Sequence, residues 1–246
     1  MIDFNLFIYL AITIFLSATI QGIAGFGFAL ISIPIMSIFF PITTVIPIIV
    51  FYSLISNFTV IFKTLKFTNF KKIFPMIISG IIGIPIGASI LKTFNPTNLK
   101  IAVGFVILFT SFIMLKGYKI RFKKEKISYI VTGLISGILN GSLSMSGPPI
   151  VLFLNNEGYN KNEFRANLAL YSIITNILTI FTYIVSGLFS EHIVKTSLIG
   201  IIPLILGSYF GIFIAEKIKN HHFKKLILIL LIITGGITVI KSLVQL

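Results

Sequence analysis

The second half of this chain repeats the first. The segment FYSLISNFTVIF at residues 51–62 returns as LYSIITNILTIF at residues 170–181, with an offset of 119 residues and six identical positions. The same offset aligns SATIQG at 17–22 with SGILNG at 136–141. Chance similarity between isoleucine-rich segments does not readily place an Asn and a Tyr at matching positions. The sequence therefore predicts two homologous halves, about 1–118 and about 127–246, joined by a basic linker at about 116–126.

Both halves are too apolar for a water-soluble protein. Hydrophobic residues make up 56% of the 246 residues and charged residues only 11%, whereas a soluble domain has about 25% charged residues. The mean hydropathy is +1.06. We therefore expect an all-α polytopic membrane protein in which residues 1–246 form a single membrane domain, without a cleavable signal peptide at its start.

The net charge of +14 could indicate a nucleic-acid partner, but the basic residues lie in short loops between apolar runs. That pattern is typical of membrane orientation, so we expect a lipid bilayer and no nucleic acid as partner. The chain contains no cysteine, which excludes a disulfide framework and a thiolate metal site.

Two apolar segments do not fit a plain membrane crossing of about 20 residues. Plain crossings are predicted at 43–62, 73–92, 99–116, 166–188, 194–215 and 224–245. In contrast, residues 4–40 are too long for one crossing, and residues 127–154 are interrupted by Gly, Ser, Asn and Pro. Each of these two segments stands first in its half. Both are predicted to be broken helices that enter the membrane and turn back.

The distribution of lysine and arginine supports this interpretation. Basic residues gather in the loops 63–72, 116–126 and 217–225, whereas the loops 93–98 and 189–196 carry few. If the basic loops are cytoplasmic, segment 127–154 must cross an even number of times. Each half then has one hairpin and three crossings, so the halves would be inverted repeats. Eight plain crossings with parallel halves remain the alternative.

Several classes of function lack the residues they need. No Asp or Glu lies deep in an apolar segment, although buried carboxylates are the usual mark of proton relays and cation sites. The chain has no P-loop motif and no arrangement of residues suited to hydrolysis. We therefore expect neither an enzyme nor a metal or cofactor site.

The polar groups at the two interruptions suit an anion. In SLSMSGPPIVLFLNNEG, Ser146 is predicted to be an N-cap, with Pro148 or Pro149 opening a short helix whose N-terminus lies near the membrane midplane. Such an end presents free N–H groups and a positive dipole. QGIAGFGFALISIP would be the equivalent break in the first half. The candidate substrate-binding residues are Gln21, Gly22, Gly25, Gly27, Asn57, Asn140, Gly141, Ser144, Ser146, Gly147, Pro148, Arg165 and Asn176.

Each of these residue types also has a purely structural interpretation. Glycines permit close packing of membrane helices, and this is the preferred interpretation for Gly80, Gly83, Gly87, Gly207 and Gly211. The two asparagines in the repeated segment could join helices by hydrogen bonds. Arg165 could be an anchor at the membrane surface, or its guanidinium could recruit an oxyanion.

At these residues the chain resembles the sulfite exporter family TauE/SafE, also called the toluene-sulfonate uptake permeases. The resemblance covers the whole chain and is most specific in QGIAGFGFALISIPIM, GILNGSLSMSGPPIVLFL and FRANLALYS. It implies transport of sulfur-containing anions such as sulfite, thiosulfate, sulfoacetate or other sulfonates across the bacterial cytoplasmic membrane. The first break lacks the Gly-Pro-Pro of the second, so the two half-sites could contribute unequally.

The sequence therefore predicts a secondary transporter of a small anion, working by alternating access as a multi-pass protein of the cell membrane. The anion would sit between the two breaks. An anion channel with the same lining and a membrane assembly or scaffold subunit without a substrate remain alternatives, and homo-oligomerisation is left open.

Overall fold

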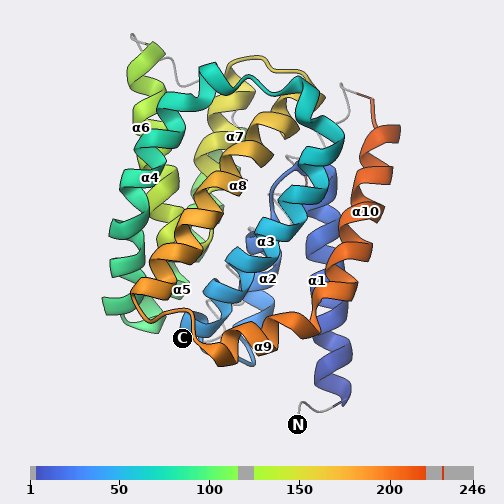
Figure 1. Ribbon diagram of the computed structural model, residues 1–246, viewed down its shortest axis with the longest axis vertical. Coiled ribbons are helices and arrows are strands. Elements are labelled where there is room, and N and C mark those ends of the chain that lie inside the picture. The colour runs from blue at the N-terminus through green and yellow to red at the C-terminus, as the bar shows by residue number, and fades with distance from the viewer. Residues whose placement is uncertain (1–3, 116–124, 220–228, 230–246) are drawn as a thin grey trace.

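A computed structural model of the chain describes residues 4–115, 125–219 and 229 (Figure 1). The described residues form helices and connecting loops, without a strand, as the sequence predicts. The elements of the first half are α1 (Phe4–Ala24), α2 (Phe28–Met36), α3 (Ile42–Thr64), the short 3₁₀ helix η1 (Leu65–Phe67), α4 (Phe70–Thr93) and α5 (Pro96–Leu115). Those of the second half are α6 (Glu125–Leu143), α7 (Gly147–Asn156), α8 (Lys161–Val185), α9 (Glu191–Ile199) and α10 (Ile201–Lys217). The predicted crossing at 224–245 and most of the linker lie outside the described residues.

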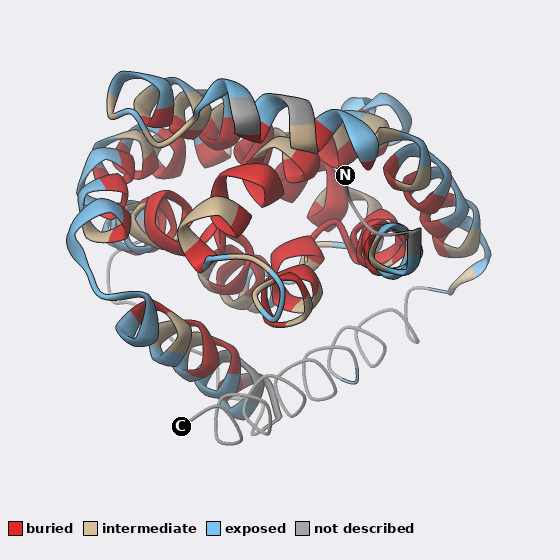
Figure 2. Ribbon diagram, turned by 90° about the horizontal axis from the view of Figure 1, so that it is seen from below, coloured by how far each residue is buried: buried red, intermediate tan, exposed pale blue. Residues whose placement is uncertain are grey.

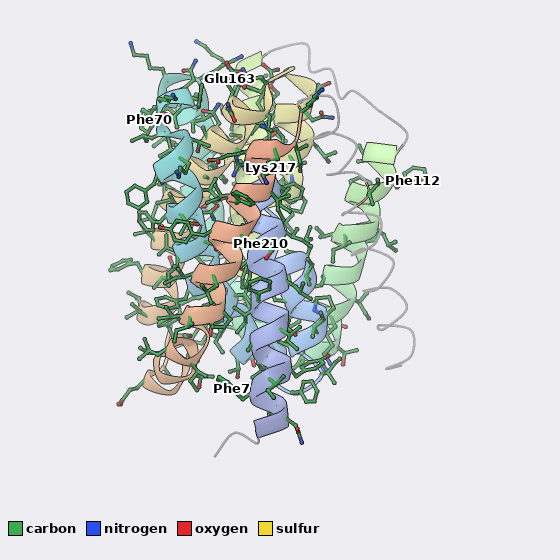
Figure 3. All side chains as sticks on the ribbon, turned by 90° about the vertical axis from the view of Figure 1, so that its right-hand side faces the viewer. Phe7, Phe70, Phe112, Glu163, Phe210 and Lys217 are labelled. Carbon is green, nitrogen blue, oxygen red and sulfur yellow. The ribbon has the colours of Figure 1, made fainter. Side chains whose placement is uncertain are left out.

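The surface of the bundle is apolar, and its interior holds polar groups. Phe70, Phe112 and Phe210 lie on the outside of the bundle (Figure 3), each about half exposed. Buried residues fill the middle of the bundle (Figure 2), and they include many Ser, Thr and Asn side chains. Among the described residues, the stretches Asn5–Ala24, Ile42–Phe67, Phe70–Thr93 and Lys161–Val185 are long and apolar enough to cross a membrane. This distribution of apolar surface is that of a membrane protein.

The chain breaks and turns back at both predicted interruptions. Gly25 and Gly27 between α1 and α2 have φ angles of 83° and 107°, in the left-handed region that glycine adopts without steric cost. After α2, the Phe39 ring lies 5.0 Å from the Tyr9 ring near the start of α1. In the second half, the Phe153 ring of α7 lies 4.5 Å from the Tyr129 ring near the start of α6. Each interrupted segment is therefore a helical hairpin.

The halves are interlocked, because α4 of the first half packs on α6 of the second, and α10 of the second half packs on α1 of the first. Glycines make this contact close: a Cβ at Gly83 of α4 would collide with the backbone of α6 at Leu134 and Ile138. In the same way, a Cβ at Gly211 of α10 would meet the Thr19 carbonyl of α1. The expectation that these glycines serve helix packing is confirmed.

Two tyrosines at equivalent positions of the repeat also make contacts between the halves. The Tyr171 hydroxyl of the second half lies against Gly80 of the first, and the Tyr52 hydroxyl of the first half lies against Gly200 of the second. Tyr52 and Tyr171 are equivalent in the repeat, and GIIGIPIG at 80–87 resembles GIIPLILG at 200–207, so similar contacts occur in both directions between the halves. Long helices α3 and α8, which carry the repeated segment, lie between the two interlocked pairs (Figure 1).

The predicted single crossing at 194–215 is wrong in one respect. The structure divides it into α9, which lies across one end of the bundle, and α10, which runs along α1 (Figure 1). Gly200 separates them, with φ −90° and ψ 2°. Pro203, in the first turn of α10, has no N–H to donate to the carbonyl four residues earlier, which removes one bond of the helical ladder at this point.

Described residues of two basic loops, 63–72 and 217–225, lie at one end of the bundle. Lys72 at the start of α4 forms an ion pair of 3.1 Å with Glu157 after α7. Lys161 at the start of α8 donates to the carbonyls of Ala215 and Ile218 at the end of α10, at 3.0 and 2.8 Å. Lys217 and Glu163 therefore lie towards one end of the molecule and Phe7 towards the other (Figure 3). We call these the basic end and the far end.

Candidate functional site

The two breaks meet at a small internal cavity. A Cβ placed on Gly147 at the start of α7 would lie 3.1 Å from the Cβ of Phe26 in the first break. The cavity beside this contact has about 30 Å³ open to the centres of water molecules. Nine of the predicted site residues line it: Gln21, Gly25, Gly27, Asn57, Ser144, Ser146, Gly147, Pro148 and Asn176. The other lining residues include Ser53, Ser172, Phe26, Met145 and the first turn of α2.

The cavity lies halfway along the longest helices. Ser53 and Asn57 on α3, like Ser172 and Asn176 on α8, stand about 17 and 23 Å along their helices from the first residue. The hydrocarbon core of a bilayer is about 30 Å thick. A polar group at this depth must find its partner inside the protein or in a cavity that the protein lines.

The two breaks supply different numbers of free N–H groups. The first three N–H groups of a helix have no partner within the helix. In α2 these belong to Phe28, Ala29 and Leu30, and Gly27 provides no side-chain cap. In α7 the equivalent positions hold Gly147 followed by two prolines, which have no N–H. The sequence left the relative contributions of the two half-sites open, and the structure places more backbone donors at the first break.

Neutral side chains complete the lining. Ser144 is 6% exposed and has a φ angle of 55°, which is unusual for a residue other than glycine. Its hydroxyl has no hydrogen-bond partner among the described residues, and neither does the Oδ1 atom of Asn57, which is 2% exposed. Unpaired polar atoms at this burial are costly and are a reason to expect a polar ligand.

Sequence reasoning did not include Ser53 and Ser172 among the site residues. They stand four residues before Asn57 and Asn176, at equivalent positions of the repeated segment. Residues four apart lie on one face of a helix, so the face of each asparagine also carries a serine. This spacing was the signal that would have identified them.

Four predicted site residues lie outside the lining, and three of them take part in helix contacts. Gly22 packs against the Ser208 carbonyl of α10, and Gly141 against the Ile84 carbonyl of α4. Asn140 donates to Asn176 Oδ1 at 3.0 Å and to Thr179 Oγ1 at 2.9 Å. Asn140 therefore contacts the site through Asn176, which lines the cavity.

Arg165 lies directly behind the first break. It is 2% exposed, and its Nη2 atom donates to the Gly22 carbonyl at 2.7 Å. A Cβ on Gly25 would lie 3.5 Å from the Arg165 Cα, so Gly25 separates the arginine from the cavity. No Asp or Glu lines the cavity. The nearby guanidinium is therefore a buried positive charge beside a neutral site, which favours a negatively charged ligand.

The described residues contain no cluster of His, Asp or Glu that could hold a metal ion. The arrangement offers backbone and side-chain hydrogen-bond donors, a positive field, and no group placed to activate a nucleophile. Donors arranged in this way suit an anion.

Comparison with known proteins identifies the family. A family model described as "Sulfite exporter TauE/SafE" matches residues 10–237, nearly the whole chain. Neither a curated protein nor a solved structure matches the chain significantly. The extent of the family match covers both breaks, both long central helices and the contacts between the halves. The chain therefore belongs to the sulfite exporter TauE/SafE family of membrane transporters.

Proposed function

We propose that this protein is a secondary transporter of small sulfur-containing anions in the cell membrane. The observation that carries the proposal is the cavity in which two helix breaks meet, lined by the first turn of α2, which has no side-chain cap, and by no carboxylate. Membership of the TauE/SafE family supports the substrate class. Sulfite, thiosulfate and sulfonates are the anions to test first.

The anion would accept hydrogen bonds from the first turn of α2, from the N–H of Gly147 and from the hydroxyls of Ser53, Ser144 and Ser172. Asn57 and Asn176 would donate from the two long helices. Arg165 and Asn140 act from behind the lining, the arginine through its charge and the asparagine by orienting Asn176. The remaining candidates, Gly22 and Gly141, set the distance between helices.

The enclosed volume favours a compact ion. A cavity with about 30 Å³ open to water centres holds one or two water molecules or a small oxyanion. A bulky organic sulfonate would require the two breaks to move apart. Because neutral donors bind more weakly than a paired cation would, they suit a carrier that must also release its substrate.

We further propose alternating access between inverted halves. The crosswise contacts of Tyr52 with Gly200 and of Tyr171 with Gly80 support this proposal, because other transporters use internal pseudo-symmetry for alternating access. With the anion at the interface of the halves, rocking one against the other would expose it first to one side of the membrane and then to the other. The multi-pass topology would place the basic end in the cytoplasm.

Flux into proteoliposomes tests the proposal. Purified protein should carry labelled sulfite, thiosulfate or a small sulfonate, and unlabelled anion on the opposite side should accelerate this flux. Flux without saturation or counterflow would favour the channel alternative. If no anion moved and a cation did, the anion assignment would be wrong. If the wild-type protein moved no ion at all, the scaffold alternative would be favoured.

A further inference from the structure

The ends of the two broken helices are held by side chains of one helix, α8. Gly22 of α1 and Gly141 of α6 are equivalent in the sequence repeat. Arg165 Nη2 donates to the Gly22 carbonyl at 2.7 Å, and the Tyr183 hydroxyl donates to the Gly141 carbonyl at 2.6 Å. Two equivalent backbone oxygens therefore have donors of different chemistry from the same helix.

Both carbonyls lack a backbone donor from their own helix, because each helix ends just after them. In a continuing helix, each would accept from the N–H four residues further on. After Gly22 the chain leaves the helix at Gly25. After Gly141 the N–H of Met145 donates instead to the Leu139 carbonyl, at 3.1 Å. The side chains of α8 thus replace a backbone bond that each break has removed.

The two donors flank the cavity on one face of α8. Arg165 precedes the lining residue Ser172 by seven residues, and Tyr183 follows the lining residue Asn176 by seven. Seven residues are about two turns and about 10 Å, so each donor lies about that far from the cavity along the helix. Arg165 is on the side of the basic end, and Tyr183 is near the far end, where Lys92 contacts the carbonyl of Ser186.

We propose that these two hydrogen bonds are the latches of the transport cycle, with Arg165 and Tyr183 as positioning residues. This inference rests on the proposed function. The latch at Arg165 closes the path from the cavity to the basic end by holding α1 against α8. The latch at Tyr183 closes the path to the far end by holding α6 against α8. Opening to either side releases one latch and keeps the other.

Because the two donors differ in chemistry, the two hydrogen bonds differ in strength and in their response to a bound anion. The bond from Arg165 is charge-assisted and buried, and such bonds are about twice as strong as neutral ones. An anion in the cavity attracts the same guanidinium, whose Nε atom has no partner among the described residues. Binding of the anion would therefore weaken the latch at the basic end, while the neutral bond from Tyr183 does not respond to charge.

The absence of cysteine gives a direct test. Ser53→Cys introduces one thiol in the cavity on α3, a helix that carries neither latch. Its rate of modification by a membrane-impermeant maleimide is measured in right-side-out and inside-out vesicles without substrate. In this background, Arg165→Met should raise labelling from the basic end about tenfold or more, and Tyr183→Phe should raise labelling from the far end about three- to tenfold. Arg165→Lys retains a charged donor and should stay close to the parent.

Two controls remove similar bonds away from the cavity. Tyr171→Phe deletes another buried hydroxyl of α8 that donates to α6, at the Gly133 carbonyl. Lys161→Met deletes another cation of α8 that caps a helix end, at Ala215 and Ile218. Both should label like the parent. If Arg165→Met does not fold, the shorter and uncharged Arg165→Gln replaces it.

Labelling that rises from the same face in both variants, that does not change in either, or that rises equally in the controls would overturn the proposal. Because labelling needs no substrate, this outcome is distinct from a failure of the proposed function, which the flux assay decides. If the protein moved anions but the variants showed no side-specific labelling, the proposed transport function would stand and the latch proposal would be wrong.

Discussion

At the scale of single residues, the site depends on where hydrogen-bond donors are present or missing. The sequence predicted both breaks, because glycine and proline interrupt apolar runs there. It could not rank them, since proline both favours the start of a helix and removes a donor. Ala29 of α2 aligns with Pro148 of α7 at the repeat offset of 119. These two positions therefore allow a matched pair of substitutions, Ala29→Pro and Pro148→Ala.

Ala29→Pro should weaken anion transport. Proline is tolerated in the first turn of a helix, as α7 demonstrates, so α2 should still form while losing one N–H of the turn that lines the cavity. The expected effect is a rise in KM of about three- to tenfold with little change in thermal stability. Pro148→Ala restores an N–H in the other half and should not raise KM. Equal KM values for Ala29→Pro and the wild type would exclude the first turn of α2 from binding.

Ser144→Gly should affect stability and binding in opposite directions. A non-glycine residue with φ 55° costs about 1 kcal/mol relative to glycine, so the melting temperature should rise. The same change deletes the unpartnered hydroxyl at the cavity, so anion affinity should fall about threefold or more. Thermal unfolding and flux measured on one preparation check both signs. If the variant were more stable and bound the anion as tightly as the wild type, Ser144 would not contribute to anion binding.

At the scale of helices, glycine has two roles that the sequence alone does not separate. Gly22 and Gly141 were predicted in the site, but they face α10 and α4, because the partner helix comes from the other half of the chain. Hydrophobic periodicity cannot show which helix a glycine faces when several neighbouring helices are apolar all round. The same limit applies to Arg165: its type and position were visible, but its contact with the end of α1 depends on tertiary packing.

Gly83→Ala and Gly211→Ala should both destabilise the protein. An added Cβ would enter the backbone of α6 in one case and of α1 in the other, and membrane helices held by close backbone contact do not tolerate this. We expect a loss of about 2 kcal/mol or more for each, measured by thermal unfolding in detergent. Ile82→Ala on the lipid-facing side of α4, where Ile82 is 61% exposed, should change stability much less. Similar losses at positions 82 and 83 would contradict the interlocked arrangement.

At the scale of the whole molecule, the charge of the loops and the internal repeat predicted the arrangement better than individual segments did. Requiring the basic loops to share one face led to the hairpin at 127–154, and the structure brings Glu157 and Lys72 into an ion pair at that end. The division of 194–215 at Gly200 was not predicted, because a similar run with glycine and proline at 80–87 lies within the single helix α4. The interlocking of the halves likewise leaves no mark in the order of elements.

Reporter fusions test the orientation in the membrane. Fusions after Asn156 and after Lys219 should report the cytoplasmic face, since both positions lie at the basic end. A fusion after Asn95, between α4 and α5, should report the opposite face. If the first two fusions reported different faces, the hairpin at α6 and α7 would be incompatible with the membrane topology.

The central claim is that a sulfur oxyanion binds where the two helix breaks meet. The most direct measurement is an experimental structure of the protein in lipid with selenite, a heavier analogue of sulfite that can be located by anomalous scattering. The account predicts one selenium position within hydrogen-bond reach of the first turn of α2 and of Ser144. Selenium bound elsewhere, or unbroken helices through 25–27 and 144–146, would contradict it.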